Sequence, residues 1–219
     1  MTNLAIVIGV CDYMTPTGNL PACRPDADAI AKILRTEPKF DEVLYIDTDT
    51  RSSVVKQKII EFISAHKNQE IGDFVFYFSG HGDFSGDEFF YLLTDYDSRR
   101  RKQTALENSE LDNLVRLLNP VLFVKIVDAC HSGVAYIKNA DDFNAYLLKT
   151  AAPQFKKVYF MFSSQSEQFS YQDSQLSYFT RTMIESIAHH GVSSVRYKDM
   201  IDYRAGLGNL HRTIGGVSA

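Results

Sequence analysis

The sequence predicts an α/β fold, a largely parallel sheet flanked by helices on both faces, and two observations carry this prediction. Continuous apolar runs of strand length alternate along the chain with segments whose apolar residues recur at helical spacing. Strands buried on both faces have such uninterrupted apolar runs, and their alternation with helices favours parallel pairing. With 219 residues, 45% of them hydrophobic, the chain can form one well-cored domain.

The N-terminal half shows this alternation most regularly. Its predicted strands are residues 4–10, 43–46 and 74–78, and its predicted helices are residues 26–34 and 52–66. Ser52 or Ser53 is the expected cap of the second helix, because a hydroxyl can accept a hydrogen bond from the first helical turn. The third strand is expected to end at His81.

The C-terminal half continues the pattern with longer connections. Its predicted elements are a hairpin arm at residues 89–93, a helix at 110–118 ended by Pro120, strands beginning at residues 124 and 158, and helices at 178–187 and 197–203. Between the last two strands lies a connector, residues 134–157, with a helical middle around residues 143–148. Residues 206–219 do not form a recognisable last strand.

Composition limits the classes of partner. The formal net charge of −4 argues against nucleic acid, because phosphate binding needs concentrated positive charge. The one basic run, residues 99–102, is interpreted as a solvated loop tip. Neither a signal peptide nor a membrane-spanning segment is recognisable, and three cysteines without metal-like spacing fit a reducing compartment, so we expect a cytoplasmic protein.

The motif VKIVDACHSG contains the candidate nucleophile, Cys130. A buried strand that ends in small residues and a cysteine brings the sulfur to the edge of a parallel sheet, where open α/β folds place their chemistry. A cysteine after an apolar run is more often a small buried residue, and Cys11 and Cys23 are interpreted in that way.

A second motif, DFVFYFSGHGD, supplies the candidate base, His81. Two strands that end in a histidine and a cysteine at one sheet edge can bring the imidazole and the thiol together. His81 and Cys130 are 49 positions apart, a separation that allows them to lie on neighbouring strands. The glycines on either side of His81 are interpreted as serving access rather than packing.

These two motifs together resemble the caspase and metacaspase superfamily of cysteine proteases. The DxCHSG form is more similar to metacaspases and bacterial caspase-like proteins than to animal caspases, and the resemblance extends over about residues 4–190. It implies a caspase-like sheet and a peptidase domain over residues 1–205. It also implies a thiol protease with His81 and Cys130 as the catalytic pair.

Further site residues are implied by the same resemblance. In metacaspases, aspartates at the positions of Asp26 and Asp128 line an acidic pocket for arginine or lysine, and Ser79 matches another pocket position. The backbone N–H groups of Gly82 and Cys130 are the implied oxyanion donors. From the residues alone, Asp26 can instead cap a helix and Asp128 can bond a strand end. His131 is interpreted as structural.

No cofactor is expected, because the acidic segments that hold calcium in calcium-dependent metacaspases are not recognisable and Asp95 and Asp97 form only a weak pair. The expected partners are a protein substrate with a basic residue before the cleaved bond and an activating protease or regulatory partner. The connector, which contains Lys138, Lys149, Lys156 and Lys157, is interpreted either as an inhibitory lid released by cleavage or as an ordered joining helix.

Three classes of function remain open. The first is an endopeptidase specific for arginine or lysine; the resemblance implies roles for it in signalling, cell death or antiviral defence. The second is a catalytically silent caspase-like scaffold that binds a partner. The third is an unrelated α/β domain that shares only the strand ends.

Overall fold

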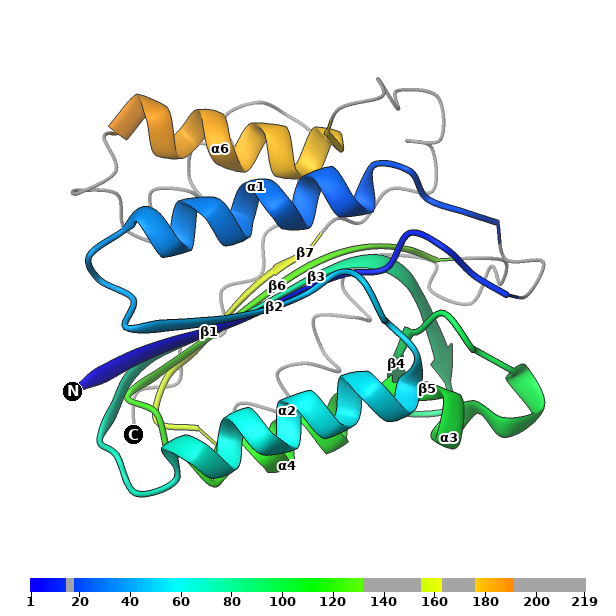
Figure 1. The fold of residues 1–219 in the computed structure, drawn as a ribbon, viewed down its shortest axis with the longest axis horizontal. Coiled ribbons are helices and arrows are strands. Elements are labelled where there is room, and N and C mark those ends of the chain that lie inside the picture. Colours follow the sequence, from blue (N-terminus) through cyan, green and yellow to red (C-terminus); the bar gives the residue numbers. More distant parts are fainter. Residues whose placement is uncertain (15–17, 132–154, 163–175, 191–219) are drawn as a thin grey trace.

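The computed structural model describes residues 1–14, 18–131, 155–162 and 176–190 (Figure 1). In chain order the elements are β1 (Thr2–Gly9), α1 (Cys23–Thr36), β2 (Glu42–Ile46), α2 (Ser52–His66), β3 (Ile71–Ser85), β4 (Glu88–Leu92), the 3-10 helix η1 (Ser98–Arg100), α3 (Arg101–Thr104), β5 (Ala105–Glu107), α4 (Asn108–Arg116), β6 (Leu122–His131), β7 (Val158–Phe162) and α6 (Tyr178–His190).

The sheet has seven strands, and its main part is parallel. β2, β1, β3, β6 and β7 lie side by side in that order, each parallel to its neighbours. β4 pairs antiparallel with the last residues of β3, and β5 pairs antiparallel with β4. Helices α1 and α6 cover one face and α2 and α4 the other (Figure 1). The predicted α/β fold is confirmed.

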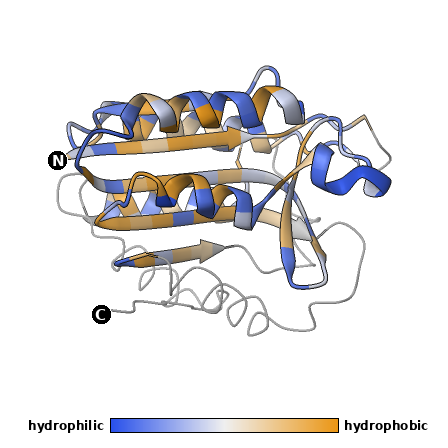
Figure 2. Ribbon diagram, turned by 90° about the horizontal axis from the view of Figure 1, so that it is seen from below, coloured by the Kyte–Doolittle hydropathy of each residue, from blue (hydrophilic) through white to orange (hydrophobic). Residues whose placement is uncertain are grey.

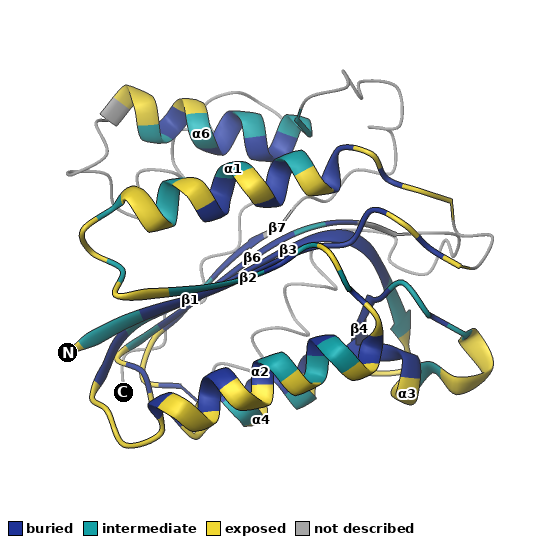
Figure 3. Ribbon diagram, viewed as in Figure 1, coloured by how far each residue is buried: buried dark blue, intermediate teal, exposed yellow. Residues whose placement is uncertain are grey.

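Two apolar layers hold the helices to the sheet. The strands are apolar along most of their length (Figure 2), and each helix turns its buried side inward and its exposed side outward (Figure 3). Along β1, successive side chains alternate between the two layers, as the pleat requires. Leu4, Ile6 and Ile8 join the layer of α2, which includes Val55 and Ile59, and Ala5 and Val7 join the layer of α1, which includes Ala27 and Ile30.

Several predicted bounds are wrong for identifiable reasons. β3 does not end at His81 but continues to Ser85, because β4 pairs with its residues 82–85 after a turn at Gly86. Helix α1 begins at Cys23, so Asp26 lies in its first turn and is not its cap. Residues 99–102 are helical rather than a loop tip, although Arg99, Arg100 and Lys102 are exposed. Most of the connector and residues 197–203 and 206–219 lie outside the described residues.

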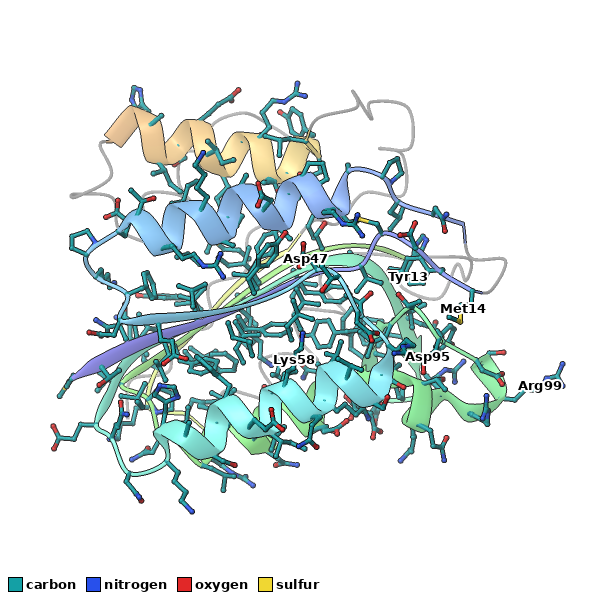
Figure 4. All side chains as sticks on the ribbon, viewed as in Figure 1. Tyr13, Met14, Asp47, Lys58, Asp95 and Arg99 are labelled. Atoms are coloured by element: carbon teal, nitrogen blue, oxygen red, sulfur yellow. The ribbon has the colours of Figure 1, made fainter. Side chains whose placement is uncertain are left out.

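The start of α2 shows a capping arrangement that the local sequence does not predict. Its cap residue is Arg51, which makes no side-chain capping bond. Instead Asp95 lies near this end of the helix (Figure 4). Its carboxylate accepts hydrogen bonds of 2.7 Å from both the backbone N–H and the hydroxyl of Ser52. Ser52 therefore donates to the capping carboxylate of Asp95 and does not itself cap the helix. A carboxylate at this position satisfies an unpaired N–H and the positive end of the helix dipole.

A buried ion pair fastens β6 to α4. Lys125 lies in the middle of β6 with its side chain fully buried and pairs with Asp112 of α4. The same ammonium group donates to the side-chain oxygen of Asn108 at 2.7 Å. Burial lowers the pKa of Lys125 and raises the pKa of Asp112, since both lose water. The strand that carries Cys130 is thus held to α4 by a buried ion pair, and removing either partner alone would destabilise the fold.

Candidate active site

The sheet register brings the two predicted catalytic positions together. β3 and β6 are parallel neighbours, and His81 is paired directly with Cys130. The separation of these residues along the chain is spanned by β4, η1, α3, β5 and α4, which carry the chain back to the same sheet edge. The side chains of Cys130 and His131 lie outside the described part of the chain.

The imidazole of His81 is buried, and contacts from the loop after β1 hold it. Its Nε2 lies 3.0 Å from the carbonyl oxygen of Gly18. A carbonyl only accepts hydrogen bonds, so Nε2 carries a proton and the neutral ring has its lone pair on Nδ1. The ring also packs on Tyr13, with 4.7 Å between the ring centroids.

The two glycines beside His81 have packing roles, which corrects the interpretation that they serve only access. A Cβ atom at Gly80 would lie 2.8 Å from the Tyr13 hydroxyl oxygen and 2.7 Å from the Phe78 ring. A Cβ atom at Gly82 would lie 2.5 Å from the Phe89 ring. The residues around His81 therefore fill the space that a side chain at either position would need.

Asp26, Ser79 and Asp128 converge beside this pair, from α1, β3 and β6. The hydroxyl of Ser79 donates to Asp26 at 3.3 Å, and both residues are buried. Ser177, just before α6, connects the two carboxylates: its backbone N–H donates to Asp26 at 2.8 Å and its hydroxyl to Asp128 at 2.5 Å. Asp128 is partly exposed. Both aspartates thus lie in one polar cluster.

Burial and mutual repulsion set the charge of this cluster. Loss of water, followed by the negative charge of Asp128, raises the pKa of Asp26 from 3.8 to about 7, although hydrogen bonds from Ser177 and Ser79 oppose the shift. Near neutral pH, Asp26 is therefore protonated in a substantial fraction of the molecules. An incoming cation would favour its release.

Ser177 is the cluster member that the sequence did not predict. Its hydroxyl also accepts a hydrogen bond from the backbone N–H of Thr180 at 3.0 Å, so it caps α6. The available signal was the serine that precedes the predicted helix at residues 178–187. Capping could have been predicted from that signal, but contact with Asp26 and Asp128 could not, because it depends on how α6 lies across the sheet.

The other cysteines and the acidic pair have structural roles that their burial and contacts show. Cys11 and Cys23 are buried, and burial raises the pKa of both thiols, so they remain protonated as small core residues. Asp97 accepts from the backbone N–H of Arg99 at the start of η1, and Asp95 caps α2, so each has a structural task. Among the described residues, no helix is long and apolar enough to cross a membrane.

Comparison with known proteins finds a matching family model and solved structures of similar fold. A family model described as Caspase domain matches residues 2–203. Protein GSU0716 from Geobacter sulfurreducens has a similar structure, with a TM-score of 0.60 and 19% identity over 93% of this chain and 88% of that one. The Drosophila initiator caspase Dronc has a TM-score of 0.59 and 12% identity over 98% of this chain and 75% of that one.

At these identities the two structures show a common fold and nothing more. A search of curated proteins finds no match. The family match, which spans most of the chain, is the finding that assigns the protein: the chain belongs to the caspase-domain family of cysteine peptidases.

Proposed function

We propose that this protein is a cysteine endopeptidase in which His81 and Cys130 form the catalytic pair and which cleaves after arginine or lysine. The observation that carries the proposal is the pairing of these two residues across β3 and β6 in a chain of the caspase-domain family. The carboxylates of Asp26 and Asp128, which meet beside the same strand ends, support the basic specificity.

The proposed reaction begins with a proton transfer to His81. Because Nε2 donates to Gly18, Nδ1 takes the proton of the Cys130 thiol. The sulfur lone pair then forms a bond to the scissile carbonyl carbon, and the carbonyl π electrons move to oxygen. The backbone N–H groups of Gly82 and Cys130 are the proposed donors to this oxyanion.

The second half of the reaction reverses the proton transfer. The carbon–nitrogen bond breaks as Nδ1 gives its proton to the leaving amine, which leaves a thioester on Cys130. A water molecule, deprotonated by the same nitrogen, attacks this thioester. The sulfur leaves as the thiol and the peptide acid is released.

The acidic cluster is proposed to recognise the residue before the cleaved bond. Asp128 is partly exposed and would meet the cation first, whereas Asp26 lies behind it with Ser79 and Ser177. Two adjacent carboxylates, one buried and one only partly exposed, are costly unless a cation compensates them. A guanidinium can bond both through its planar fork, and an acidic side chain would be repelled.

Short fluorogenic peptides that end in arginine, lysine or aspartate test the reaction and its specificity. We expect turnover of the arginine and lysine peptides, reduced to background in Cys130→Ala and by about 10²- to 10⁴-fold in His81→Ala. Unchanged thermal stability of both variants is the control for folding. Normal turnover in Cys130→Ala, or cleavage mainly after aspartate, would contradict the proposal.

A matched pair of variants isolates the pocket. Asp128→Asn should weaken cleavage after arginine by about 2 to 3 kcal/mol in transition-state binding, roughly a hundredfold in kcat/KM. Asp28→Asn, an exposed site on α1, is the control and should leave cleavage unchanged. Equal effects of the two variants would argue against an acidic pocket.

The remaining parts of the proposal concern the cofactor, the compartment and the pathway. No cofactor takes part, so adding or chelating calcium should not change turnover. The cytoplasm is the proposed compartment, because a catalytic thiol must stay reduced. The pathway, in signalling or antiviral defence, rests on the family resemblance.

A silent scaffold is the alternative function. Absence of turnover of every peptide by a protein with an intact fold would favour it.

A further inference from the structure

The loop between β1 and α1 makes three separate contacts with His81. The Tyr13 hydroxyl oxygen accepts a hydrogen bond of 2.8 Å from the backbone N–H of His81. The Tyr13 ring lies against the imidazole at 55°. The Gly18 carbonyl accepts from Nε2 at 3.0 Å. The main chain, the ring face and one ring nitrogen of His81 are thus held from the same side.

The first contact replaces a missing strand. β1 pairs with β3 as far as Gly9 and Ser79, and the last backbone bond, from the N–H of Val10 to the carbonyl of Ser79, is 2.9 Å long. Two residues further along β3, the N–H of His81 points to the same side, where β1 has already ended. The Tyr13 phenol supplies the acceptor there, and a buried N–H without one would cost free energy.

The loop that carries these contacts is itself tied together. The backbone N–H of Tyr13 donates to the side-chain oxygen of Asn19 at 3.0 Å, and the N–H of Leu20 donates to the Cys11 carbonyl at 2.8 Å. Asn19 is the residue after Gly18, so its bond fixes the distance between the two groups that contact His81. Figure 4 shows Tyr13 on this loop, at the end of the sheet that carries the site.

The loop is also fastened to the segment after β4. The N–H of Met14 donates to the Thr94 carbonyl at 2.9 Å, and the Thr94 hydroxyl donates to the Asp12 carbonyl at 2.8 Å. Burial raises the pKa of Tyr13 well above its usual value of 10, so the phenol keeps its proton at working pH and remains a neutral acceptor. Tyr13 is therefore a rigidly placed group.

We propose that Tyr13 is a positioning residue for the catalytic base: its hydroxyl fixes the main chain of His81 so that Nε2 stays on the Gly18 carbonyl and Nδ1 keeps the lone pair. This inference rests on the proposed function, because His81 is a catalytic base only if the protein is a peptidase. The orientation of His81 can be measured without any substrate. The peptidase activity and the positioning role can therefore fail independently.

Tyr13→Phe removes the hydroxyl and keeps the ring. We expect kcat for an arginine peptide to fall about 10- to 100-fold with KM nearly unchanged, because misplacing a catalytic group costs rate while the acidic cluster is untouched. Tyr91→Phe is the matched control. It removes another buried tyrosine hydroxyl, one that donates to Asn108 at 3.1 Å, and should leave kcat at the wild-type value.

Imidazole ¹⁵N NMR measures which ring nitrogen of His81 carries the proton. A purely structural role of Tyr13 would not change this tautomer. Wild type should show His81 protonated at Nε2, with its signals among the six histidines identified by their loss in His81→Gln. In Tyr13→Phe the two ring nitrogens should move toward a mixture of tautomers, and in Tyr91→Phe they should not. Unchanged His81 signals together with wild-type kcat in Tyr13→Phe would overturn the inference.

A second variant covers the case in which Tyr13→Phe does not fold. Asn19 is exposed, so Asn19→Ala should fold and should shift the same NMR signals and kcat in the same direction, by a smaller factor. No shift in this variant would contradict the role of the tied loop. If wild type cleaves no peptide while its His81 signals respond as described, the proposed function fails and the positioning role stands.

Discussion

At the residue scale, Asp26 has the most unusual charge state of the described part of the site. Its ordinary pKa is 3.8, and burial together with the charge of Asp128 raises the pKa to about 7. Between these values the folded protein holds a proton that the unfolded chain releases. The free energy of unfolding should therefore fall as pH rises toward about 7, and then level off.

Asp26→Asn should remove that dependence. The amide keeps an oxygen for the Ser177 N–H but has no charge to bury. Relative to wild type, the variant should gain on the order of 2 to 4 kcal/mol between about pH 4 and about pH 8, measured by urea unfolding. The exposed Asp28→Asn should show no such gain. A constant difference between Asp26→Asn and wild type would mean that Asp26 titrates normally.

The sequence predicted these residues unevenly. Asp26, Ser79 and Asp128 are next to motifs, so a family resemblance could indicate them. Ser177 and Tyr13 could not be predicted, because their roles are contacts with residues 151 and 68 positions away in the chain. The packing role of the glycines around His81 could not be predicted either, since the Tyr13 hydroxyl and the Phe89 ring are brought to them only by folding.

At the element scale, β6 depends on its buried ion pair. Lys125→Met alone leaves the Asp112 carboxylate buried without its cation and should lower the free energy of unfolding by about 3 to 5 kcal/mol. The double variant Lys125→Met/Asp112→Leu should recover most of this loss. Urea unfolding of both single variants and the double variant gives the coupling energy. Additive losses in the double variant would show that the pair does not act as a unit.

The start of α2 depends on Asp95. Asp95→Ala removes both acceptors of Ser52 and should lower the free energy of unfolding by about 1 to 2 kcal/mol, measured by urea unfolding. Asp95→Asn keeps one acceptor oxygen and should lose less. Calcium should not alter the difference between wild type and Asp95→Ala. A calcium-induced rise in Tm that disappears in the variant would assign Asp95 to a metal site instead.

Most element types could be predicted from periodicity, and element ends could not. The two layers of β1 and the apolar faces of α1 and α2 follow directly from the residue pattern. The extension of β3 through His81 depends on pairing with β4, and the cap of α2 comes from a residue 43 positions away. Lys125 lies in an apolar run whose pattern gives no sign of its partner in α4.

At the scale of the whole molecule, the candidate site can form only when the sheet is complete. His81 and Cys130 come from β3 and β6, Asp26 comes from the helix after β1, and Ser177 comes from the start of α6. These elements meet at the carboxyl ends of the parallel strands, where side chains from several crossovers converge. Cleaving the chain between β6 and β7 need not separate them, because both strands are held in one sheet.

Under the proposed specificity, self-cleavage in the connector is therefore compatible with an intact candidate site. The contacts just before β7 indicate which lysines should resist it. Of the four lysines, Lys156 and Lys157 precede β7 directly. Phe155 is buried, with its ring 4.9 Å from that of Phe123, and the N–H of Phe123 donates to the carbonyl of Lys157 at 2.9 Å. A protease needs a free, extended segment, so this fastened end should resist cleavage. We expect cleavage after Lys138 or Lys149.

Cys130→Ala incubated with a trace of wild type is the substrate, and N-terminal sequencing of the fragments is the measurement. Lys138→Gln/Lys149→Gln should stay uncut, whereas Lys156→Gln/Lys157→Gln should be cut as before. New termini at Lys157 or Val158 would contradict the protection of the fastened end, and an uncut wild type that is already fully active would exclude an inhibitory lid.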